Sequence, residues 1–249
     1  MVDPAIAVIP ARYASERFPG KPLVPIAGVP MIVRVARQVA ASKQIDRVVI
    51  ATDDPRIRDV VTEAGFEVVM TSPNCASGSD RVAEVARTLP ASLIVNVQGD
   101  EPLLDPADLD ALVQSAIAHP DAVTTLARPI SGPAAFANPN VVKLVRGLTG
   151  QALYFSRSPI PHAAGGTQPP ALQHVGLYAY PPAVLARFTA LPPSPLEKLE
   201  RLEQLRALEN GIPIHVTMCV SVRPSIGVDV PEDLAEVLSE LERRTNQDQ

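Results

Sequence analysis

Apolar and polar positions alternate in blocks along the first half of the chain. Short β-branched runs predict strands at Ile6–Ile9, Val48–Ala51, Glu67–Met70, Leu93–Val97 and Ala122–Leu126. The segments between them are amphipathic and predict helices near Met31–Ala41, Ile57–Ala64, Asp80–Leu89 and Pro106–His119. Strands that are apolar throughout and separated by helices indicate βαβ units and a mostly parallel α/β sheet covered on both faces.

Helix starts are predicted where a capping side chain precedes a proline or an acid. The dipeptides Asp105-Pro106 and Ser79-Asp80 have this pattern. A parallel α/β sheet binds its ligands beyond the carboxyl ends of the strands. Functional side chains are therefore expected in the loops after Ile9, Ala51, Met70 and Val97.

The second half of the chain has a different pattern. Val141–Val145 and Ala152–Ser156 predict a hairpin, and Gln173–Tyr180 predicts another strand. Leucines three residues apart predict one helix over Leu196–Leu208, in the core or at a subunit contact, and Glu232–Leu241 predicts a final helix. We expect a core of residues 1–130 and 213–245 and a smaller β-rich lobe of about 131–212, which carries substrate and subunit contacts. The polar end Glu242–Gln249 is expected to fray.

Composition narrows the function classes for this chain of 249 residues. A net charge of −5, 4% aromatic residues and the lack of tryptophan argue against nucleic-acid binding. The sequence contains no apolar run of about 18 residues and no signal-peptide pattern, so we expect a cytoplasmic protein without a membrane span. Cys75 and Cys219 form no CxxC motif, which fits a reducing compartment, and each is expected to be a buried apolar residue.

The loop Pro10–Leu23 places Arg12, Arg17 and Lys21 directly after a core strand. Fixed cations at the carboxyl edge of a sheet suit a polyphosphate, since arginine can hold phosphate oxygens in a bidentate way. The alternative is a solvated charged loop. The stretch Pro-Gly-Lys-Pro argues against it, because it predicts a rigid loop and rigidity favours a preorganised binding site. The sequence contains neither GxGxxG nor GxxxxGK[ST], so a dinucleotide fingerprint and a P-loop are excluded.

Two aspartates are candidate metal ligands. Asp100 follows the strand Leu93–Val97 after a glycine, and Asp229 lies between two valines before the last helix. Two carboxylates together with phosphate oxygens and water are the ligands that Mg²⁺ prefers. A turn or helix-cap role for Asp100 is the alternative.

Two further segments carry candidate binding residues. The small-residue loop Ser77–Arg81 enters a helix and can present backbone N–H groups to a base or a phosphate, unless it is a plain helix cap. His174 and Tyr178 share one face of a predicted strand, and Gly176 between them leaves room for a ligand. The alternative for that face is the exposed polar side of an edge strand.

At this point the chain resembles a known family, the 3-deoxy-manno-octulosonate (Kdo) cytidylyltransferases. The resemblance spans nearly the whole chain in order. It rests on the strings Ile9–Leu23, Ala51–Asp53, Ser77–Arg81, Asn96–Pro102, Tyr154–Ile160, His174–Tyr178, Ser194–Glu197, Leu202–Arg206 and Gly227–Asp233. It departs in the stretch 162–173, which is shorter and less charged than the corresponding loop of some relatives, and we expect this loop to order over the sugar.

The resemblance implies a Rossmann-like nucleotidyltransferase fold, a homodimer, and transfer of CMP from CTP to Kdo for lipopolysaccharide biosynthesis. It implies catalytic roles for Arg12, Lys21, Asp100 and Asp229, the last two holding Mg²⁺. It implies nucleotide contacts by Pro10, Ala11, Arg12, Ser15, Arg17, Lys21, Ser77, Gly78, Arg81 and Gln98. It implies sugar contacts by Gln98, Arg157, His174, Tyr178 and Glu203, with Arg157 as partner of the sugar carboxylate.

Two alternatives remain open at this stage. Within enzymes, the acceptor could be another α-keto acid sugar, such as an amino-substituted Kdo or a sialic acid. From a different class, the same fold could serve as a non-catalytic nucleotide-binding regulator. Loss of Asp100 or Asp229 would favour that second reading, and the sequence retains both.

Overall fold

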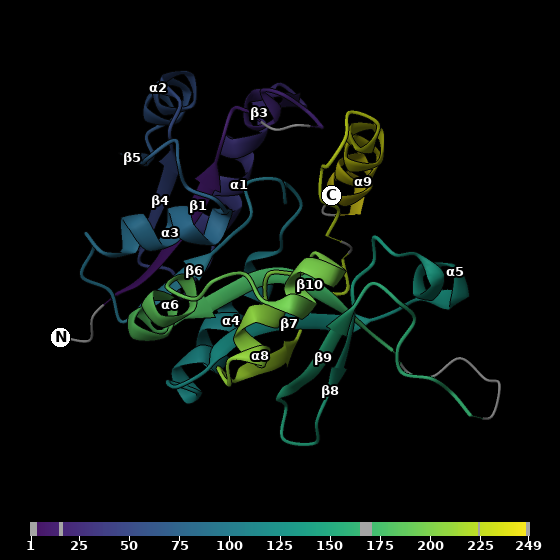
Figure 1. The fold of residues 1–249 in the computed structure, drawn as a ribbon. Helices are drawn as coiled ribbons and strands as arrows, with labels where there is room; N and C mark the ends of the chain where they lie inside the picture. Colours follow the sequence, from purple (N-terminus) through teal and green to yellow (C-terminus); the bar gives the residue numbers. More distant parts are fainter. Residues whose placement is uncertain (1–3, 15–16, 165–170, 224, 248–249) are drawn as a thin grey trace.

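A nine-stranded mixed sheet forms the centre of the molecule (Figure 1). The computed structural model describes residues 4–14, 17–164, 171–223 and 225–247. Seven strands follow one another in the order β11-β7-β10-β6-β1-β4-β5. Their bounds are β1 Ala5–Ala11, β4 Arg47–Thr52, β5 Glu67–Met70, β6 Leu93–Asn96, β7 Val123–Pro129, β10 Leu172–Tyr180 and β11 Ile214–Met218.

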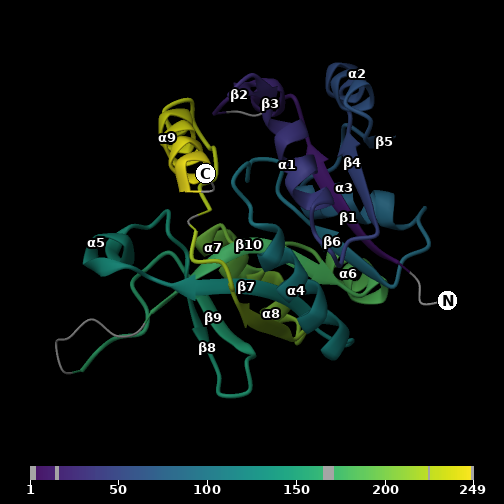
Figure 2. The same cartoon turned by 180° about the vertical axis from the view of Figure 1, so that it is seen from behind.

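Helices cover both faces of the sheet, as the fully apolar strands predict. Side chains alternate along β1, so Ile6 and Val8 belong to one core cluster while Ala7 and Ile9 belong to the other. The first face packs α3 (Gly78–Ala86), α6 (Pro182–Thr189) and α8 (Leu205–Glu209). The opposite face packs α1 (Met31–Ala40), α2 (Pro55–Glu63) and α4 (Pro106–Ala118). Figure 1 and its reverse view, Figure 2, show α3 and α6 on one side and α1 and α4 on the other.

The pattern of the first half predicts the structure well. The five expected strands and four expected helices are confirmed, with ends that differ by a few residues. The hairpin is confirmed as β8 (Lys143–Arg146) and β9 (Ala152–Ser156). Five short or late elements were not predicted. They are β2 (Pro25–Ile26), β3 (Val29–Pro30), α5 (Gly132–Ala137), α6 and β11, together with the 3₁₀ turn Lys21–Leu23.

Strand β10 is a central strand of the sheet. It lies between β6 and β7 and runs antiparallel to both. The division of the chain into a core and a lobe stays a prediction, but β10 falls within the residues expected for the lobe. The alternative of an exposed edge strand is wrong for this segment, because neighbours cover both of its edges.

The single helix expected over Leu196–Leu208 is wrong. The chain forms α7 (Pro195–Glu200) and α8, separated at Arg201, whose backbone is left-handed with φ of 52°. A three-residue leucine repeat drifts around a continuous helix, and the break corrects this drift. It turns Leu202 and Leu205 into the core, while Leu199 stays 79% exposed.

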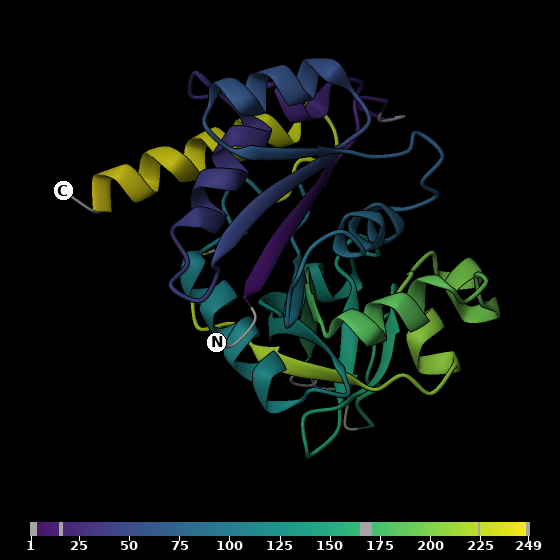
Figure 3. The same ribbon diagram turned by 90° about the vertical axis from the view of Figure 1, so that its left-hand side faces the viewer.

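The last helix packs beside α1 and beside the basic loop, the segment that carries Arg12, Arg17 and Lys21 (Figure 3). Helix α9 (Asp233–Gln247) buries Val237 against Ile26, Met31 and Leu103. The expected fraying from Glu242 is wrong up to Gln247, where the helix ends. The loop expected to order over the sugar falls partly outside the described residues, at 165–170. Within the described part, no helix combines the length and the apolar character needed to cross a membrane.

Lys143 offers a test of the packing around the hairpin. Its side chain is fully buried, and its ammonium donates to the backbone carbonyls of Asn138, Val141 and Arg157. Burial lowers its pKa. We expect Lys143→Met to lower the free energy of unfolding by about 3 kcal/mol, because buried carbonyls are left unsatisfied. Denaturant unfolding measures this, with exposed Lys43→Met as control; equal small effects for the two variants would contradict the prediction.

Candidate functional site

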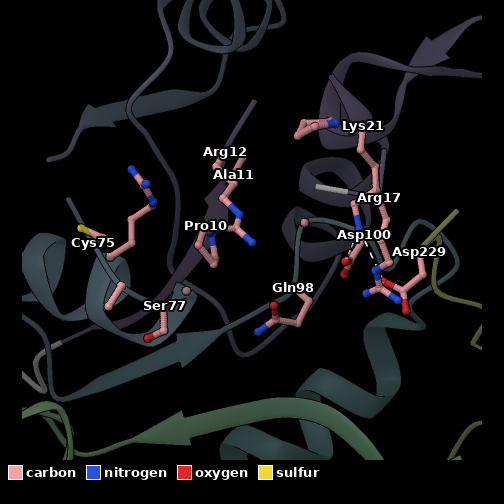
Figure 4. A pocket seen from close by; sticks show the side chains of 15 residues that line it. Pro10, Ala11, Arg12, Arg17, Lys21, Cys75, Ser77, Gln98, Asp100 and Asp229 are labelled. Carbon is pink, nitrogen blue, oxygen red and sulfur yellow. Dashed lines mark hydrogen bonds and ion pairs between the residues drawn. The ribbon is translucent and has the colours of Figure 1, made fainter. Parts of the chain in front are cut away.

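A pocket of about 350 Å³ opens at the carboxyl ends of β1 and β6, the edge at which parallel α/β sheets bind their ligands (Figure 4). It collects residues from the basic loop, the β5–α3 loop, the β6 loop and the segment before α9. Its lining consists of Pro10, Ala11, Arg12, Arg17, Lys21, Pro22, Cys75, Ala76, Ser77, Gly78, Arg81, Gln98, Gly99, Asp100 and Asp229. All the residues predicted for the nucleotide are therefore brought together, except Ser15, which lies outside the described residues.

At the floor of the pocket, the backbone at Gly99 lies close to the backbone of Pro10. A Cβ at Gly99 would lie 3.0 Å from the carbonyl oxygen of Pro10, tighter than side chains tolerate. Glycine at this position therefore lets the loop after β6 pass directly over the end of β1. This contact fixes Asp100 at the edge of the sheet.

The Lys21 ammonium joins the two predicted metal ligands. It donates to Asp100 Oδ2 at 2.6 Å and to the Val228 carbonyl oxygen at 2.8 Å, and it lies 3.8 Å from Asp229 Oδ1. Its side chain is only 13% exposed. Since one ammonium reaches both carboxylates, Asp100 and Asp229 lie around a shared point that accommodates positive charge.

The two arginines of the basic loop are exposed at the mouth of the pocket. Arg17 donates to Asp229 Oδ1 at 2.9 Å, with side chains 66% and 57% exposed. Within the described part of the chain, no carboxylate pairs with Arg12. Both guanidinium groups can therefore turn to an incoming anion at small cost, since exposed ion pairs contribute little.

Helix α3 points its amino end into the pocket. Ser77 is its N-cap and forms a capping box with Asp80, whose backbone N–H donates to Ser77 Oγ at 3.1 Å. The helix start expected at Ser79-Asp80 is thus corrected to Ser77. Ser77 therefore caps the helix, and the first backbone N–H groups of this nine-residue helix lie at the pocket wall, so the binding role of the loop stays a prediction.

Arg81 is held by residues that sequence reasoning missed. The guanidinium, almost fully buried, donates to Thr71 Oγ1 and to Asp53 Oδ2, the latter at 3.2 Å. Both follow a strand end, and Asp53 also belongs to the string Ala51–Asp53 that carries the family resemblance, but no contact with Arg81 was predicted. Cys75, expected to be buried, instead lines the pocket and donates to Glu84 Oε2 at 3.2 Å. Burial raises the pKa of its thiol to about 11, so it stays protonated.

Four of the residues predicted for the sugar come from the loop after β6 (Gln98), from β10 (His174 and Tyr178) and from the turn between α7 and α8 (Glu203). Gln98 Nε2 donates to Asn96 Oδ1 at 3.3 Å, and Asn96 stands opposite Tyr178 in the sheet. Glu203 accepts from Ser79 Oγ at 2.6 Å, and its other carboxylate oxygen is buried without a hydrogen-bond partner among the described residues. This side of the site is enclosed and polar.

His174 lies deep against β7 and β9. Thr125 Oγ1 donates to the Leu177 carbonyl at 2.8 Å and therefore accepts from His174 Nε2 at 3.0 Å. This assignment leaves Nδ1 as a hydrogen-bond acceptor. The ring packs edge-on against Phe155, and burial lowers its pKa to about 3. His174 is consequently a neutral acceptor at physiological pH.

Arg157 is placed differently from the rest of the predicted sugar residues. Its guanidinium donates to the backbone carbonyls of Glu200, Pro139 and Arg201, at 2.8, 3.0 and 3.4 Å. It thereby ties the end of β9 to the break between α7 and α8. It does not line the pocket that holds the basic loop.

The two aspartates suit a Mg²⁺ that is shared with substrate. Among the described residues, no group of three or more His, Cys, Asp or Glu side chains could hold a metal ion. Asp100 and Asp229 supply two carboxylates at a point already neutralised by Lys21. Mg²⁺ takes one or two protein carboxylates and completes six ligands with phosphates and water. Asp100 and Asp229 fit this mode of Mg²⁺ binding, because the cations predicted to bind phosphate lie beside them.

A third carboxylate lies just behind this pair. Glu101 is mostly buried and accepts from Ser225 Oγ at 2.6 Å. Burial raises its pKa to about 7, and the negative charges of Asp100 and Asp229 add to this shift. The hydrogen bond from Ser225 and the charge of Arg128 oppose it. The sequence offered no reason to single out Glu101.

Comparisons with known proteins agree with the geometry. A cytidylyltransferase family profile matches residues 6–216. The 3-deoxy-manno-octulosonate cytidylyltransferase of Syntrophotalea carbinolica is 51% identical over 245 residues, 94% of this chain and 97% of that protein. The Myxococcus xanthus protein of the same name is 50% identical, covering 93% and 94%. A solved CMP:2-keto-3-deoxy-manno-octonic acid synthetase complexed with CTP matches with TM-score 0.91 and 41% identity, covering 97% and 99%. A Methanothermobacter thermautotroptrophicus nucleotidyl transferase, 14% identical with TM-score 0.64, shares the fold.

The buried His174 predicts a pH dependence of stability. Its folded-state pKa of about 3 lies below the ordinary 6.5, so the unfolded chain binds more protons between these values and stability decreases there as the pH is lowered. We expect wild type to lose up to about 2 kcal/mol more than His174→Gln between pH 7 and 5. Denaturant unfolding at both pH values measures this; parallel losses would show that His174 is solvated.

Proposed function

The chain belongs to the 3-deoxy-manno-octulosonate cytidylyltransferases, a family of nucleotidyltransferase enzymes, and from this premise we infer that it transfers the CMP group of CTP to Kdo. The products are CMP-Kdo, the activated sugar for lipopolysaccharide, and pyrophosphate. The observation that carries the proposal is the pocket itself. It joins a cationic loop, a helix amino end and two carboxylates at one edge of the sheet.

The nucleotide fits the cationic side of the pocket. Arg12, Arg17 and Lys21 face the same space as the amino end of α3 at Ser77. Backbone N–H groups at a helix start and fixed cations both favour phosphate oxygens. Arg81, held in place by Thr71 and Asp53, lies on the wall beside Gly78, where the cytidine would be enclosed.

The sugar fits the enclosed side, at Gln98, Tyr178, His174 and Glu203. Neutral His174 offers Nδ1 as an acceptor for a sugar hydroxyl. Glu203 Oε1, which pairs with Arg206 at 3.5 Å but accepts no hydrogen bond among the described residues, offers another. Arg157 is proposed to bind the sugar carboxylate. Its three backbone contacts mean that it must release at least one carbonyl to do so.

In the reaction the anomeric hydroxyl of Kdo attacks the α-phosphorus of CTP in line. The new oxygen–phosphorus bond forms as the bond to the β-phosphate oxygen breaks, and the hydroxyl proton passes to solvent. Arg12, Arg17 and Lys21 neutralise the charge that develops on the leaving pyrophosphate. Mg²⁺, when bound by Asp100 and Asp229, makes the attacking hydroxyl more acidic and offsets phosphate charge.

A homodimer in the cytoplasm completes the proposal. Exposed leucines lie in the β8–β9 turn, on β9 and on α7, at Leu148, Leu153 and Leu199. They offer apolar surface that a second copy of the chain would bury.

The test of the function is pyrophosphate release. We expect turnover with CTP and Kdo and at least tenfold lower kcat/KM with UTP or ATP, or with N-acetylneuraminate as acceptor. An amino-substituted Kdo in the same assay distinguishes the close sugar analogues. Turnover with sialic acid but none with Kdo would overturn the substrate assignment.

The proposed metal ligand Asp229 allows a second test, because it is half-exposed. Asp229→Asn should lower kcat by about 100-fold or more, as for loss of one charge contact in a transition state. The free energy of unfolding should change by less than about 1 kcal/mol, since the pair with Arg17 is exposed. Steady-state kinetics at saturating Mg²⁺ and denaturant unfolding measure both quantities.

The control is Glu232→Gln, which removes an exposed negative charge three residues further along. It should leave kcat within about twofold. Near-normal turnover of Asp229→Asn would remove this residue from the metal site, and a large loss of stability would make it structural.

A further inference from the structure

The segment 225–229 brings Asp229 back to the sheet edge from far along the chain. Three hydrogen bonds seat it there besides the ion pairs of Asp229 with Arg17 and Lys21. The Val228 backbone N–H donates to the Asp100 carbonyl at 2.9 Å, and the Val228 carbonyl accepts from Lys21 at 2.8 Å. The third contact is the hydrogen bond from Ser225 Oγ to Glu101 Oε2, at 2.6 Å.

Glu101 fits closely under this segment. A Cβ at Gly227 would lie 3.3 Å from Glu101 Oε1, a tight contact, so the chain passes close over the carboxylate. One Glu101 oxygen thus holds Ser225 while the other lies against Gly227. Both contacts act within the four residues that precede Asp229.

From these contacts we propose that Glu101 is a positioning residue that holds Asp229 at the metal point through Ser225 and Gly227. The proposal rests on the proposed function, because it assigns Asp229 to Mg²⁺. Glu101 is not itself among the residues that line the pocket. Instead it fixes the register between the loop after β6 and the segment before α9, so that Asp100 and Asp229 face one another.

A neighbouring contact provides a matched control. Ser221 Oγ donates to Asp105 Oδ2 at 2.7 Å, four residues earlier in the same crossing segment. It is also a serine hydroxyl that donates to a carboxylate, but the carboxylate belongs to Asp105 at the start of α4. Ser221→Ala therefore removes an equivalent hydrogen bond without loosening the residues next to Asp229.

The experiment compares Ser225→Ala, Ser225→Thr, Glu101→Gln and Ser221→Ala in the full chain. Hydrogen exchange of the Val228 amide is measured without metal or nucleotide. Calorimetry then gives the Mg²⁺ affinity with CTP present, and kinetics give kcat and the KM for CTP. Partners behind a metal ligand typically change metal affinity or activity by about 10- to 100-fold.

We expect Ser225→Ala to speed Val228 exchange and weaken Mg²⁺ about tenfold or more, with kcat lowered and the KM for CTP within about twofold. Ser225→Thr, which keeps the hydroxyl, should restore both. Glu101→Gln keeps an acceptor oxygen and should lie near wild type. Ser221→Ala should leave Mg²⁺ affinity unchanged.

Three results would overturn the proposal. These are unchanged Val228 exchange in Ser225→Ala, an equal Mg²⁺ loss in Ser221→Ala, or a large kcat loss in Glu101→Gln with normal exchange, since the last makes the charge itself the active feature. If the wild type releases no pyrophosphate from CTP and Kdo, the proposed function fails. Val228 exchange and Mg²⁺ affinity still decide the role of Glu101, because neither requires turnover.

Discussion

The ammonium of Lys21 donates to Asp100, which lies 79 residues further along the chain, and to the Val228 carbonyl, which lies 207 residues further along. Its position depends on the fold around it. The β1 loop must pass under the β6 loop at Gly99, and α9 must pack against α1 to return Asp229. Without the ammonium, the two facing carboxylates would repel one another. The same group therefore supports the closed arrangement of the site and prepares it for phosphate.

The cationic half of the site could be predicted from sequence because its chemistry is local. Arg12, Arg17 and Lys21 lie within ten residues after one strand, and the sheet rule places that strand's end at the ligand. Asp100 follows from the same rule at β6. Asp229 was a candidate from its place between two valines before a helix, and the family resemblance supported its pairing with Asp100, but neither its neighbours nor its spacing places it near Lys21. The first-half elements were predicted for a similar reason: each strand and helix has its own periodicity.

The features that the sequence did not predict depend on contacts between distant residues, which no local pattern encodes. The place of β10 between β6 and β7 is a pairing of distant segments, and its residues look the same in a lobe or a sheet. The break at Arg201 follows from burial of Leu202 and Leu205, which outweighs helix propensity. Arg157 reads as a free guanidinium in the sequence, yet three backbone carbonyls accept from it. Glu101 was passed over because its partner Ser225 is 124 residues away.

The place of β10 also orders events during synthesis of the chain. β6 pairs with β1 on one side, and its other edge is covered only by β10. β7 likewise reaches the rest of the sheet through β10. Until residues 172–180 leave the ribosome, the nascent chain carries an apolar strand with an open edge, the kind of surface that recruits other strands. At ~5–20 residues per second, the roughly 80 residues between the two strands take on the order of 4–16 s. During that interval, only chaperones or rapid synthesis protect the open edge of β6. The pairing of β10 then completes the sheet.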